Sequence, residues 1–305
     1  MWVDAPHVLP YQGSKRKLAA KILDCFPKEV DCLYEPFAGS AAVSLAAAAN
    51  GLAKRIVIAD KLEPLAELWT MVINEPAVLV EEYKEHWTRQ HSDPRAYFAQ
   101  VRTIYNETKS PSALLYLVAR CVKNSIRFNS KGEFNQGPDN RRLGLKPEKL
   151  AREVAKASAL LKNAATVSCG DFRKILQDAT ENDLIYMDPP WQGTSGLRDP
   201  RYAFLLDLDE LIDELARLNE RNVPYILSFD GTCGDRQYGE KLPDHLELKY
   251  VGLVAGRSSQ ATLLGRNEVT VESLYLSSSL VTRLGKAEVV QQSAKEAQLT
   301  LSWCG

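Results

Sequence analysis

The residues with the clearest chemical potential are Asp188-Pro-Pro-Trp191, which directly follow the apolar run LIYM at 184–187. A buried strand can end here, because proline has no N–H to donate to a sheet. The carboxylate of Asp188 and the free carbonyl oxygen of Pro189 then form a pair of acceptors beside the flat face of Trp191. Such a group suits a planar ligand that carries an –NH2, such as the exocyclic amine of a base. The simpler interpretation is a strand end with a loosely packed tryptophan, because short motifs often occur by chance.

A second candidate site is the small-residue turn FAGSAA at 37–42, followed at position 60 by an aspartate. Gly39 lets a ligand approach the backbone, and an acid about 20 residues after such a turn binds ribose hydroxyls in dinucleotide-binding βαβ units. The glycine pattern is incomplete, since Ala41 and Ala42 fill the other small positions. This favours a nucleoside without a pyrophosphate, such as S-adenosylmethionine. Alternatively Asp60 caps a helix, because residues 60–63 have the form of a capping box.

Strands and helices that alternate along the chain must position these residues. Residues 32–60 are typical of a β-α-β unit, with a strand through Leu33 and Tyr34, an alanine-rich helix that ends near Gly51, and a second strand at 55–59. Amphipathic helical patterns dominate residues 77–163. Strand patterns return at 183–188, 224–230, 245–253 and 268–277, with a helix expected over 207–222. The order predicts an α/β fold with a mostly parallel sheet and an inserted, mainly helical domain.

Composition and charge narrow the class of protein. The 305 residues are 45% hydrophobic and 25% charged, which is usual for a soluble globular chain. We see no stretch that is apolar enough to span a bilayer and no signal-peptide pattern at the N-terminus. We therefore expect a cytoplasmic protein. The six cysteines are scattered and the four histidines have no metal-ligand spacing, so we expect reduced thiols and no metal.

Positive charge is concentrated between residues 120 and 149. Eight Lys or Arg residues stand there against three acids, a net charge of +5, whereas the whole chain carries -1. The segment SIRFNSKGEFNQG at 125–137 is polar and contains glycine. A basic segment of this kind predicts contacts with phosphates, and an ordinary exposed turn is the alternative.

Four motifs in one order resemble the DNA adenine-N6 methyltransferases of the Dam type, the D12 class. They are YQGSKRKL at 11–18, YEPFAGSAAV at 34–43, RFNSKGEFNQG at 127–137 and DPPW at 188–191. The resemblance covers residues 8 to 278. It implies a Rossmann-like methyltransferase sheet, S-adenosylmethionine as the cofactor, and site-specific methyl transfer to N6 of a flipped adenine in duplex DNA. A restriction-modification or host DNA-marking system is the role that it implies.

The resemblance also implies roles for individual residues and segments. The target adenine would be held by Asp188, Pro189, Pro190 and Trp191. The cofactor site would comprise Tyr11, Lys15, Phe37, Gly39, Asp60, Asp171, Phe172 and Asp188. The DNA-contacting hairpin would use Arg127, Asn129, Lys131 and Asn135. Residues 1–76 and 164–278 would form a discontinuous catalytic domain, 77–163 a target-recognition domain, and 279–305 a C-terminal tail. No metal is implied.

Alternatives remain for the substrate and the activity. Related enzymes with Asn in place of Asp188 act on protein glutamine, and those with Ser often act on cytosine, so Asp188 favours adenine. The hairpin favours duplex DNA over RNA. Two positions depart from the family pattern: Ala41 replaces a glycine, and Trp191 replaces the commoner tyrosine. Ala41 hints at a non-catalytic nucleic-acid-binding relative, which the intact DPPW motif argues against. The expected partners are double-stranded DNA and a cognate restriction endonuclease, and no membrane is expected. When bound to DNA, the protein would be associated with the nucleoid.

Overall fold

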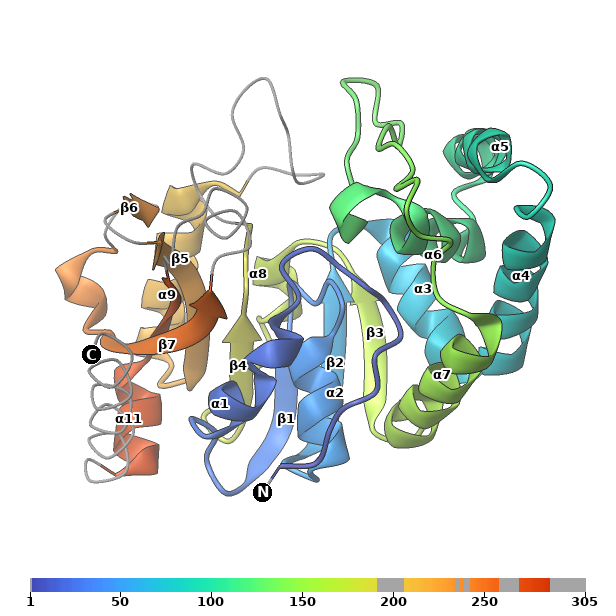
Figure 1. Ribbon diagram of the computed structural model, residues 1–305. Coiled ribbons are helices and arrows are strands. Elements are labelled where there is room, and N and C mark those ends of the chain that lie inside the picture. Colours follow the sequence, from blue (N-terminus) through green and yellow to red (C-terminus); the bar gives the residue numbers. More distant parts are fainter. Residues whose placement is uncertain (1, 191–205, 234–235, 239–241, 258–268, 286–305) are drawn as a thin grey trace.

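A single eight-stranded sheet forms the centre of the protein, whose computed structural model describes residues 2–190, 206–233, 236–238, 242–257 and 269–285 (Figure 1). The strand order is β3-β2-β1-β4-β5-β8-β7, and β6 pairs with β5. The strands are β1 (Val30–Glu35), β2 (Ala53–Asp60), β3 (Ala165–Cys169), β4 (Leu184–Met187), β5 (Tyr225–Cys233), β6 (Arg236–Tyr238), β7 (Lys249–Arg257) and β8 (Val269–Leu276).

The expected mostly parallel α/β sheet is confirmed. All pairs from β3 through β5 are parallel, while β8 runs antiparallel to both β5 and β7. After β1 the chain adds β2 and β3 on one side and later returns to place β4 on the other side. The chain therefore reverses its direction of growth between β1 and β4, and ligands of open α/β sheets bind at the carboxyl ends of strands at such a point.

Helices cover both faces of the sheet because alternate strand residues point to opposite sides. In β4, Tyr186 belongs to one hydrophobic cluster and Met187 to the other. The first cluster includes side chains of α1 (Ala19–Leu23), α2 (Ala42–Ala49), α3 (Glu63–Asn74) and α11 (Ser278–Leu284). The second includes side chains of α8 (Phe172–Ile175) and α9 (Leu208–Glu220). The first residues of the segment expected to be a tail thus form α11, whose Leu280 is fully buried.

The chain between β2 and β3 is helical apart from its loops. After α3 it forms α4 (Pro76–Arg89), α5 (Pro94–Thr108), α6 (Pro111–Arg120) and α7 (Pro147–Leu161). Each of these four helices begins with proline, whose fixed φ and missing N–H suit the first helical position. In Figure 1 the loops between α6 and α7 lie at the end of the sheet toward which the β4 arrow points. The fold therefore brings the basic segment to the edge of the sheet formed by the carboxyl ends of its parallel strands.

Candidate active site

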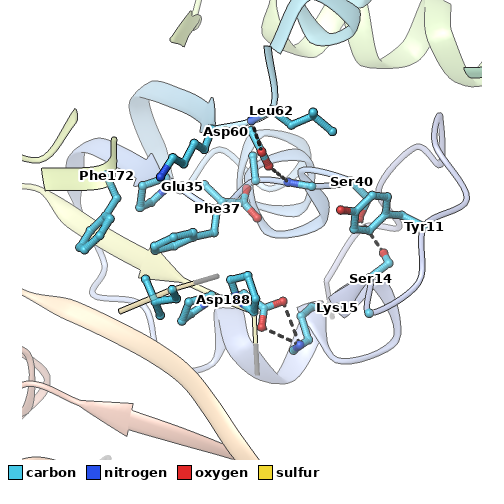
Figure 2. Close-up of a pocket in the computed structure, with 18 of the residues that line it drawn as sticks. Tyr11, Ser14, Lys15, Glu35, Phe37, Ser40, Asp60, Leu62, Phe172 and Asp188 are labelled. Atoms are coloured by element: carbon cyan, nitrogen blue, oxygen red, sulfur yellow. Dashed lines mark hydrogen bonds and ion pairs between the residues drawn. The ribbon is translucent and has the colours of Figure 1, made fainter. Parts of the chain in front are cut away.

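A cavity of about 330 Å³ opens at the carboxyl ends of β1, β2 and β4 (Figure 2). Its walls come from segments that are far apart in the sequence, namely 11–15, 35–40, 60–62, 125–126, 170–172, 188–190 and 206–207, together with Ala42, Glu210 and Glu272. All eight residues expected at the cofactor site line this cavity, as do Pro189 and Pro190. Trp191 lies outside the described residues. The tertiary structure therefore brings the expected cofactor residues and the Asp-Pro-Pro motif into one pocket.

Asp188, the first residue after β4, is held by Lys15. The Lys15 Nζ lies 2.8 Å from both carboxylate oxygens of Asp188 (Figure 2). Lys15 belongs to the short helix η1 (Lys15–Lys17) and is only 7% exposed. Burial raises the pKa of Asp188, and the neighbouring ammonium of Lys15 opposes that rise. Lys15 thus favours an ionised carboxylate that can accept hydrogen bonds.

Asp60 fastens the small-residue turn to the end of β2. Its Oδ2 accepts a hydrogen bond from the Gly39 N–H at 3.0 Å, and its Oδ1 accepts one from the Leu62 N–H at 2.9 Å (Figure 2). The capping interpretation fails, because the N-cap of α3 is Leu62 and receives no side-chain cap. Burial raises the pKa of Asp60 while the backbone N–H groups oppose that rise. Its remaining lone pairs can accept hydroxyl donors from the cavity.

The turn itself requires unusual backbone angles. Gly39 has φ +49°, and a Cβ added there would lie 3.1 Å from the ring of Tyr11. Ala41 is also left-handed, with φ 47°, although it carries a Cβ. Such a conformation costs an alanine on the order of 1 kcal/mol more than a glycine. Ala41 therefore keeps the left-handed conformation that glycine adopts readily, at a cost in stability.

Aromatic rings form the wall beside α8. The ring centroids of Phe37 and Phe172 lie 5.2 Å apart, and both residues line the cavity. Asp171 caps α8 by accepting a hydrogen bond from the Arg173 N–H, and it also forms an ion pair with the Arg173 side chain at 2.8 Å. That guanidinium lowers the pKa of Asp171 to about 2. Arg173 in turn contacts Glu210 of α9 at 2.8 Å, which joins two parts of the rim.

The cavity carries an excess of acidic residues. Among the described residues, seven acids line it against two lysines: Glu35, Asp60, Asp171, Asp188, Asp207, Glu210 and Glu272, with Lys15 and Lys61. Opposite charge favours binding in a partly desolvated pocket, so this lining suits a ligand with positive charge. Glu35 and Glu272 were not identified from the sequence. For Glu35 the available signal was its place at the end of an apolar strand, directly before the turn, whereas Glu272 lies in an ordinary strand pattern without a motif.

The basic segment between α6 and α7 contains a short hairpin. Phe128 and Phe134 form an antiparallel bridge, and the Asn135 N–H donates to the Arg127 carbonyl at 3.0 Å. Asn129 folds the turn, since its Oδ1 accepts from the Lys131 N–H at 2.9 Å and the Glu133 N–H at 3.0 Å. Lys131 and Asn135 are exposed, while Arg127 and Asn129 are partly buried. The four residues expected to contact DNA therefore share one hairpin but do not line the cavity.

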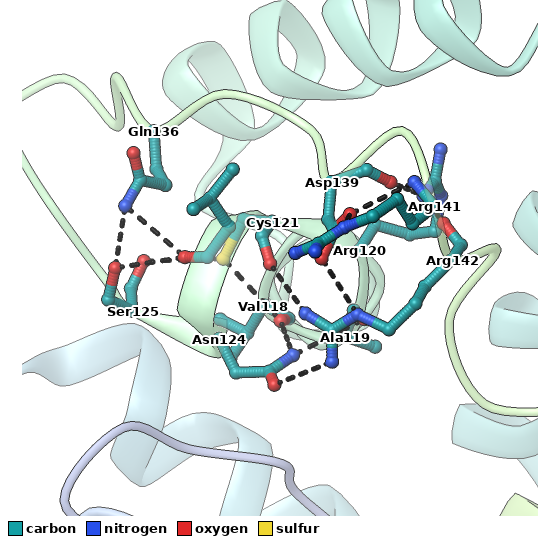
Figure 3. Close-up of polar contacts among 11 residues, drawn as sticks. Val118, Ala119, Arg120, Cys121, Asn124, Ser125, Gln136, Asp139, Arg141 and Arg142 are labelled. Carbon is teal, nitrogen blue, oxygen red and sulfur yellow. Dashed lines mark hydrogen bonds and ion pairs between the residues drawn. The ribbon is translucent and has the colours of Figure 1, made fainter. Parts of the chain in front are cut away.

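A polar network fixes the base of the hairpin (Figure 3). Asn124 donates from Nδ2 to the Val118 carbonyl at 2.8 Å and accepts at Oδ1 from Arg142 at 3.2 Å. The Asn124 carbonyl accepts from the Gln12 N–H at 2.9 Å. Ser125 and Ile126, which follow Asn124, line the cavity. The hairpin is thus joined at its base to the N-terminal segment that holds Tyr11 and Lys15.

Within the part of the chain that the structure describes, no group of three or more His, Cys, Asp or Glu residues is arranged to hold a metal ion. In that same part, no helix is long and apolar enough to cross a membrane. The described cysteines Cys25, Cys32, Cys121 and Cys169 are free thiols.

Comparison with known proteins gives a family for the chain. A family model described as "D12 class N6 adenine-specific DNA methyltransferase" matches residues 11–241. The chain is 27% identical over 226 residues to the Type II methyltransferase M.FokI of Planomicrobium okeanokoites, covering 72% of this chain and 35% of that protein. It is 29% identical over 187 residues to a DNA adenine methylase of Haemophilus influenzae, covering 60% and 63%. The chain therefore spans less than two thirds of the length of these two relatives.

A third relative matches over most of both chains. The DNA adenine methylase of Serratia marcescens is 26% identical over 271 residues, which cover 86% of this chain and 94% of that protein.

Proposed function

The chain belongs to the D12 class N6 adenine-specific DNA methyltransferase family, and from this premise we propose that it methylates N6 of adenine at specific sites in duplex DNA. S-adenosylmethionine is the proposed methyl donor. The observation that carries the proposal is the Asp188 carboxylate, which is held by Lys15 and followed by two prolines, in the cavity that all the expected cofactor residues line.

The cavity residues fit S-adenosylmethionine, which supplies a cationic sulfonium methyl group when bound. The acidic lining favours a ligand with positive charge. Phe37 and Phe172 offer apolar ring surfaces for the adenine ring, and Asp60 offers acceptors for ribose hydroxyls beside the Gly39 turn. Tyr11 and Lys15 close the side formed by the N-terminal segment.

The Asp-Pro-Pro corner supplies the acceptors for the target amine. A base inside a duplex must first be flipped out, at a cost of a few kcal/mol. Asp188 and the Pro189 carbonyl would accept the two N6–H groups and so orient the nitrogen lone pair toward the methyl group. The Asp188 carboxylate would also stabilise the positive charge that develops on the nitrogen. We propose Trp191, which lies outside the described residues, as the surface on which the flipped ring stacks.

Substitution of Asp188 by asparagine tests this function. Asp188→Asn keeps the size of the side chain but removes the negative charge, so we expect methyl transfer to fall by about 10²-fold or more. Tritium transfer from labelled S-adenosylmethionine to DNA measures the rate, and mass spectrometry of the digested nucleosides identifies the modified base. Asp213→Asn, at an exposed position on α9, is the matched control and should keep the wild-type rate. An Asp188→Asn protein with normal turnover would disprove the assignment.

Residues 77–163 are proposed as the target-recognition domain, with 1–76 and 164–278 as the catalytic domain. The net charge of +5 between residues 120 and 149 supports contact with phosphates. On the hairpin, Arg127 and Asn135 carry the groups that pair with guanine and adenine edges in the major groove. The Asn129 amide is already bonded to Lys131 and Glu133 within the turn, so Asn129 would shape the hairpin that contacts DNA. The exposed Lys131 at the turn suits a phosphate contact.

A salt titration tests the contact made by Lys131. If Lys131 neutralises one phosphate, Lys131→Gln should reduce the slope of log affinity against log salt by about 0.9, because one fewer counterion is released. Fluorescence anisotropy with labelled duplex DNA measures this slope. Lys162→Gln, an exposed change at the far end of α7, should leave the slope unaltered. Equal slopes for wild type and Lys131→Gln would place Lys131 outside the interface.

A restriction-modification system is the biological setting that we propose, with a cognate endonuclease as a partner and the cytoplasm as the location. The name of the Type II relative M.FokI supports this setting. Long-read sequencing of DNA from cells that express the protein tests it, because the method reports both the modified base and its sequence context. Methylated adenines scattered without a common sequence would contradict the site-specific role.

A further inference from the structure

Lys15 lies between two carboxylates rather than beside one. Its Nζ is 2.8 Å from the Asp188 oxygens and 3.5 Å from Oε2 of Glu272. The three side chains are largely buried, since their side-chain atoms alone are 8% exposed for Lys15, 19% for Asp188 and 16% for Glu272. Glu272 belongs to β8, which is separated from β4 by β5. The ammonium therefore connects the Asp-Pro-Pro corner to a strand that carries no recognised motif.

An irregularity in the sheet accompanies this approach of Glu272. Ser228 of β5 pairs with Leu274 of β8, but the next pair is Gly231 with Glu272. Two steps along β8 thus correspond to three steps along β5, which is the pattern of a β-bulge. Bulges near active sites change the direction of a side chain. The bulge lies between Ser228 and Gly231 of β5, and Gly231 is the residue that pairs with Glu272.

The Glu272 carboxylate is directed at Lys15 and not at the backbone of its own strand. Its Oε2 is buried, and the Lys15 ammonium lies 3.5 Å from it. A buried carboxylate is costly unless a nearby opposite charge stabilises it. The Lys15 ammonium supplies that charge at the wall of the cavity.

We propose that Glu272 is a positioning residue for the reaction, because it takes up the Lys15 ammonium when the target amine reaches Asp188. This inference rests on the proposed function. In the structure Lys15 contacts both oxygens of Asp188, including the one that would accept an N6–H group of the amine. A shift of the ammonium toward Glu272 frees acceptor sites on Asp188, yet the buried cation stays paired throughout. Without the charge of Glu272, the same shift would cost the buried ammonium an ion pair with a carboxylate, which is unfavourable.

The charged and titratable groups around Glu272 determine the expected pH dependence. Lys15 of η1 and Asp188 after β4 act directly on Glu272, and Glu272 in turn acts on Tyr186 of β4. Glu35 of β1 acts on Tyr186, and Asp188 acts on Glu35. Burial raises the pKa of Glu272, Lys15 lowers that pKa, and the negative charge of Asp188 raises it further. By the same repulsion, a neutral residue at position 272 leaves Asp188 easier to ionise. Lys15 would then stay on Asp188, where it competes with the amine.

Glu272→Gln tests the inference in single-turnover methylation with saturating DNA and cofactor. We expect the plateau rate to fall on the order of tenfold and cofactor affinity to fall by a clearly smaller factor, because the loss of positioning outweighs the loss of one acid from the cavity lining. The acid limb of the pH–rate profile should move to lower pH, which a general loss of folded protein would not cause. Glu220→Gln, exposed at the end of α9, is the control. Glu272→Asp, which keeps the charge, should recover part of the rate and the position of the limb.

A second variant pair and a direct titration complete the test. In a Lys15→Gln background, Glu272→Gln should have no further effect, since residues that act through one group are not additive. Carbon NMR with labelled aspartate measures the ionisation of the Asp188 carboxyl group without any turnover. Glu272→Gln should lower the pH at the midpoint of the Asp188 titration. A normal plateau rate, an unmoved acid limb or additive losses would each overturn the role of Glu272. If the wild-type protein itself fails to methylate DNA, the proposed function fails. The NMR titration still shows whether the charge of Glu272 influences the ionisation of Asp188 beside Lys15.

Discussion

At the scale of single residues, Glu35 is a buried carboxyl group whose contribution to the free energy of unfolding depends on pH. It ends β1, lines the cavity and accepts a hydrogen bond at Oε2 from the Ser44 N–H at 2.9 Å. Burial raises the pKa of Glu35 from 4.5 to about 7. Between those values the folded protein binds the proton more tightly than the unfolded chain. The free energy of unfolding therefore falls as the pH rises through this window.

Glu35→Gln should remove this pH dependence while its amide oxygen can still accept the Ser44 N–H bond. A shift from 4.5 to about 7 corresponds to about 3 kcal/mol, so the variant should gain roughly that much relative to wild type between pH 4.5 and 7. Urea denaturation at a series of pH values measures the difference. For the control Glu220→Gln, the free energy of unfolding should depend on pH in the same way as for wild type. The same pH dependence for Glu35→Gln would show that Glu35 ionises as freely in the folded protein as in water.

At the scale of elements, the loops between α6 and α7 depend on buried polar side chains. Arg120, at the end of α6, is 1% exposed and donates from Nη1 to the carbonyls of Asp139, at 2.9 Å, and Arg142 (Figure 3). From α4, Tyr83 donates to the Leu145 carbonyl at 2.9 Å. These side chains replace the regular hydrogen bonds that an irregular segment lacks. The path of residues 138–145, which follow the hairpin, is therefore specified by the neighbouring helices.

Arg120→Met should destabilise the protein by about 2–3 kcal/mol, because the buried carbonyl of Asp139 and the partly buried carbonyl of Arg142 lose a charged donor while the cost of burying that charge is relieved. Thermal unfolding followed by circular dichroism measures the loss. Arg95→Met, at an exposed position on α5, should change stability by no more than about 0.5 kcal/mol. DNA affinity should weaken more than cofactor affinity if the loops carry the recognition surface. An unchanged melting temperature would mean that the loops hold their path without Arg120.

At the scale of the whole molecule, one hydrophobic core joins the sheet to the helices that follow β2. Leu33 and Ile56 of the central strands belong to the same cluster as Tyr83 of α4, Leu117 of α6 and Val154 of α7. Few contacts usually cross a boundary between independent domains. A shared core of this extent couples the basic segment mechanically to the strands that end at the cavity.

The shared core should make unfolding a single cooperative transition. Tryptophan fluorescence, which includes Trp69 in α3 and Trp87 in α4, and far-ultraviolet circular dichroism should report the same urea midpoint. Two separate midpoints would show that the sheet and the helical segment fold independently. Addition of S-adenosylmethionine should raise the common midpoint, since a ligand that binds only the folded state stabilises it.

Much of the fold and part of the site could be predicted from local sequence. Proline after an apolar run ends a strand at Met187, and the small-residue turn with an alanine-rich helix produces the β1-α2-β2 unit. These features depend on backbone geometry and periodicity within a few residues, which the sequence carries directly. The motif order along the chain was also sufficient to indicate the family that the comparison with known proteins then confirmed.

Contacts between distant segments were decided only by the tertiary structure. Lys15 and Asp188 are 173 positions apart, and their ion pair exists because the order of strands brings η1 over the end of β4. Asp60 had the sequence pattern of a helix cap, but the pairing of β1 with β2 places it against Gly39 instead. Glu272 reaches Lys15 across a sheet irregularity that no periodicity reveals. The physical reason is that strand order and register minimise the free energy of the whole packed core, so they follow from no single segment.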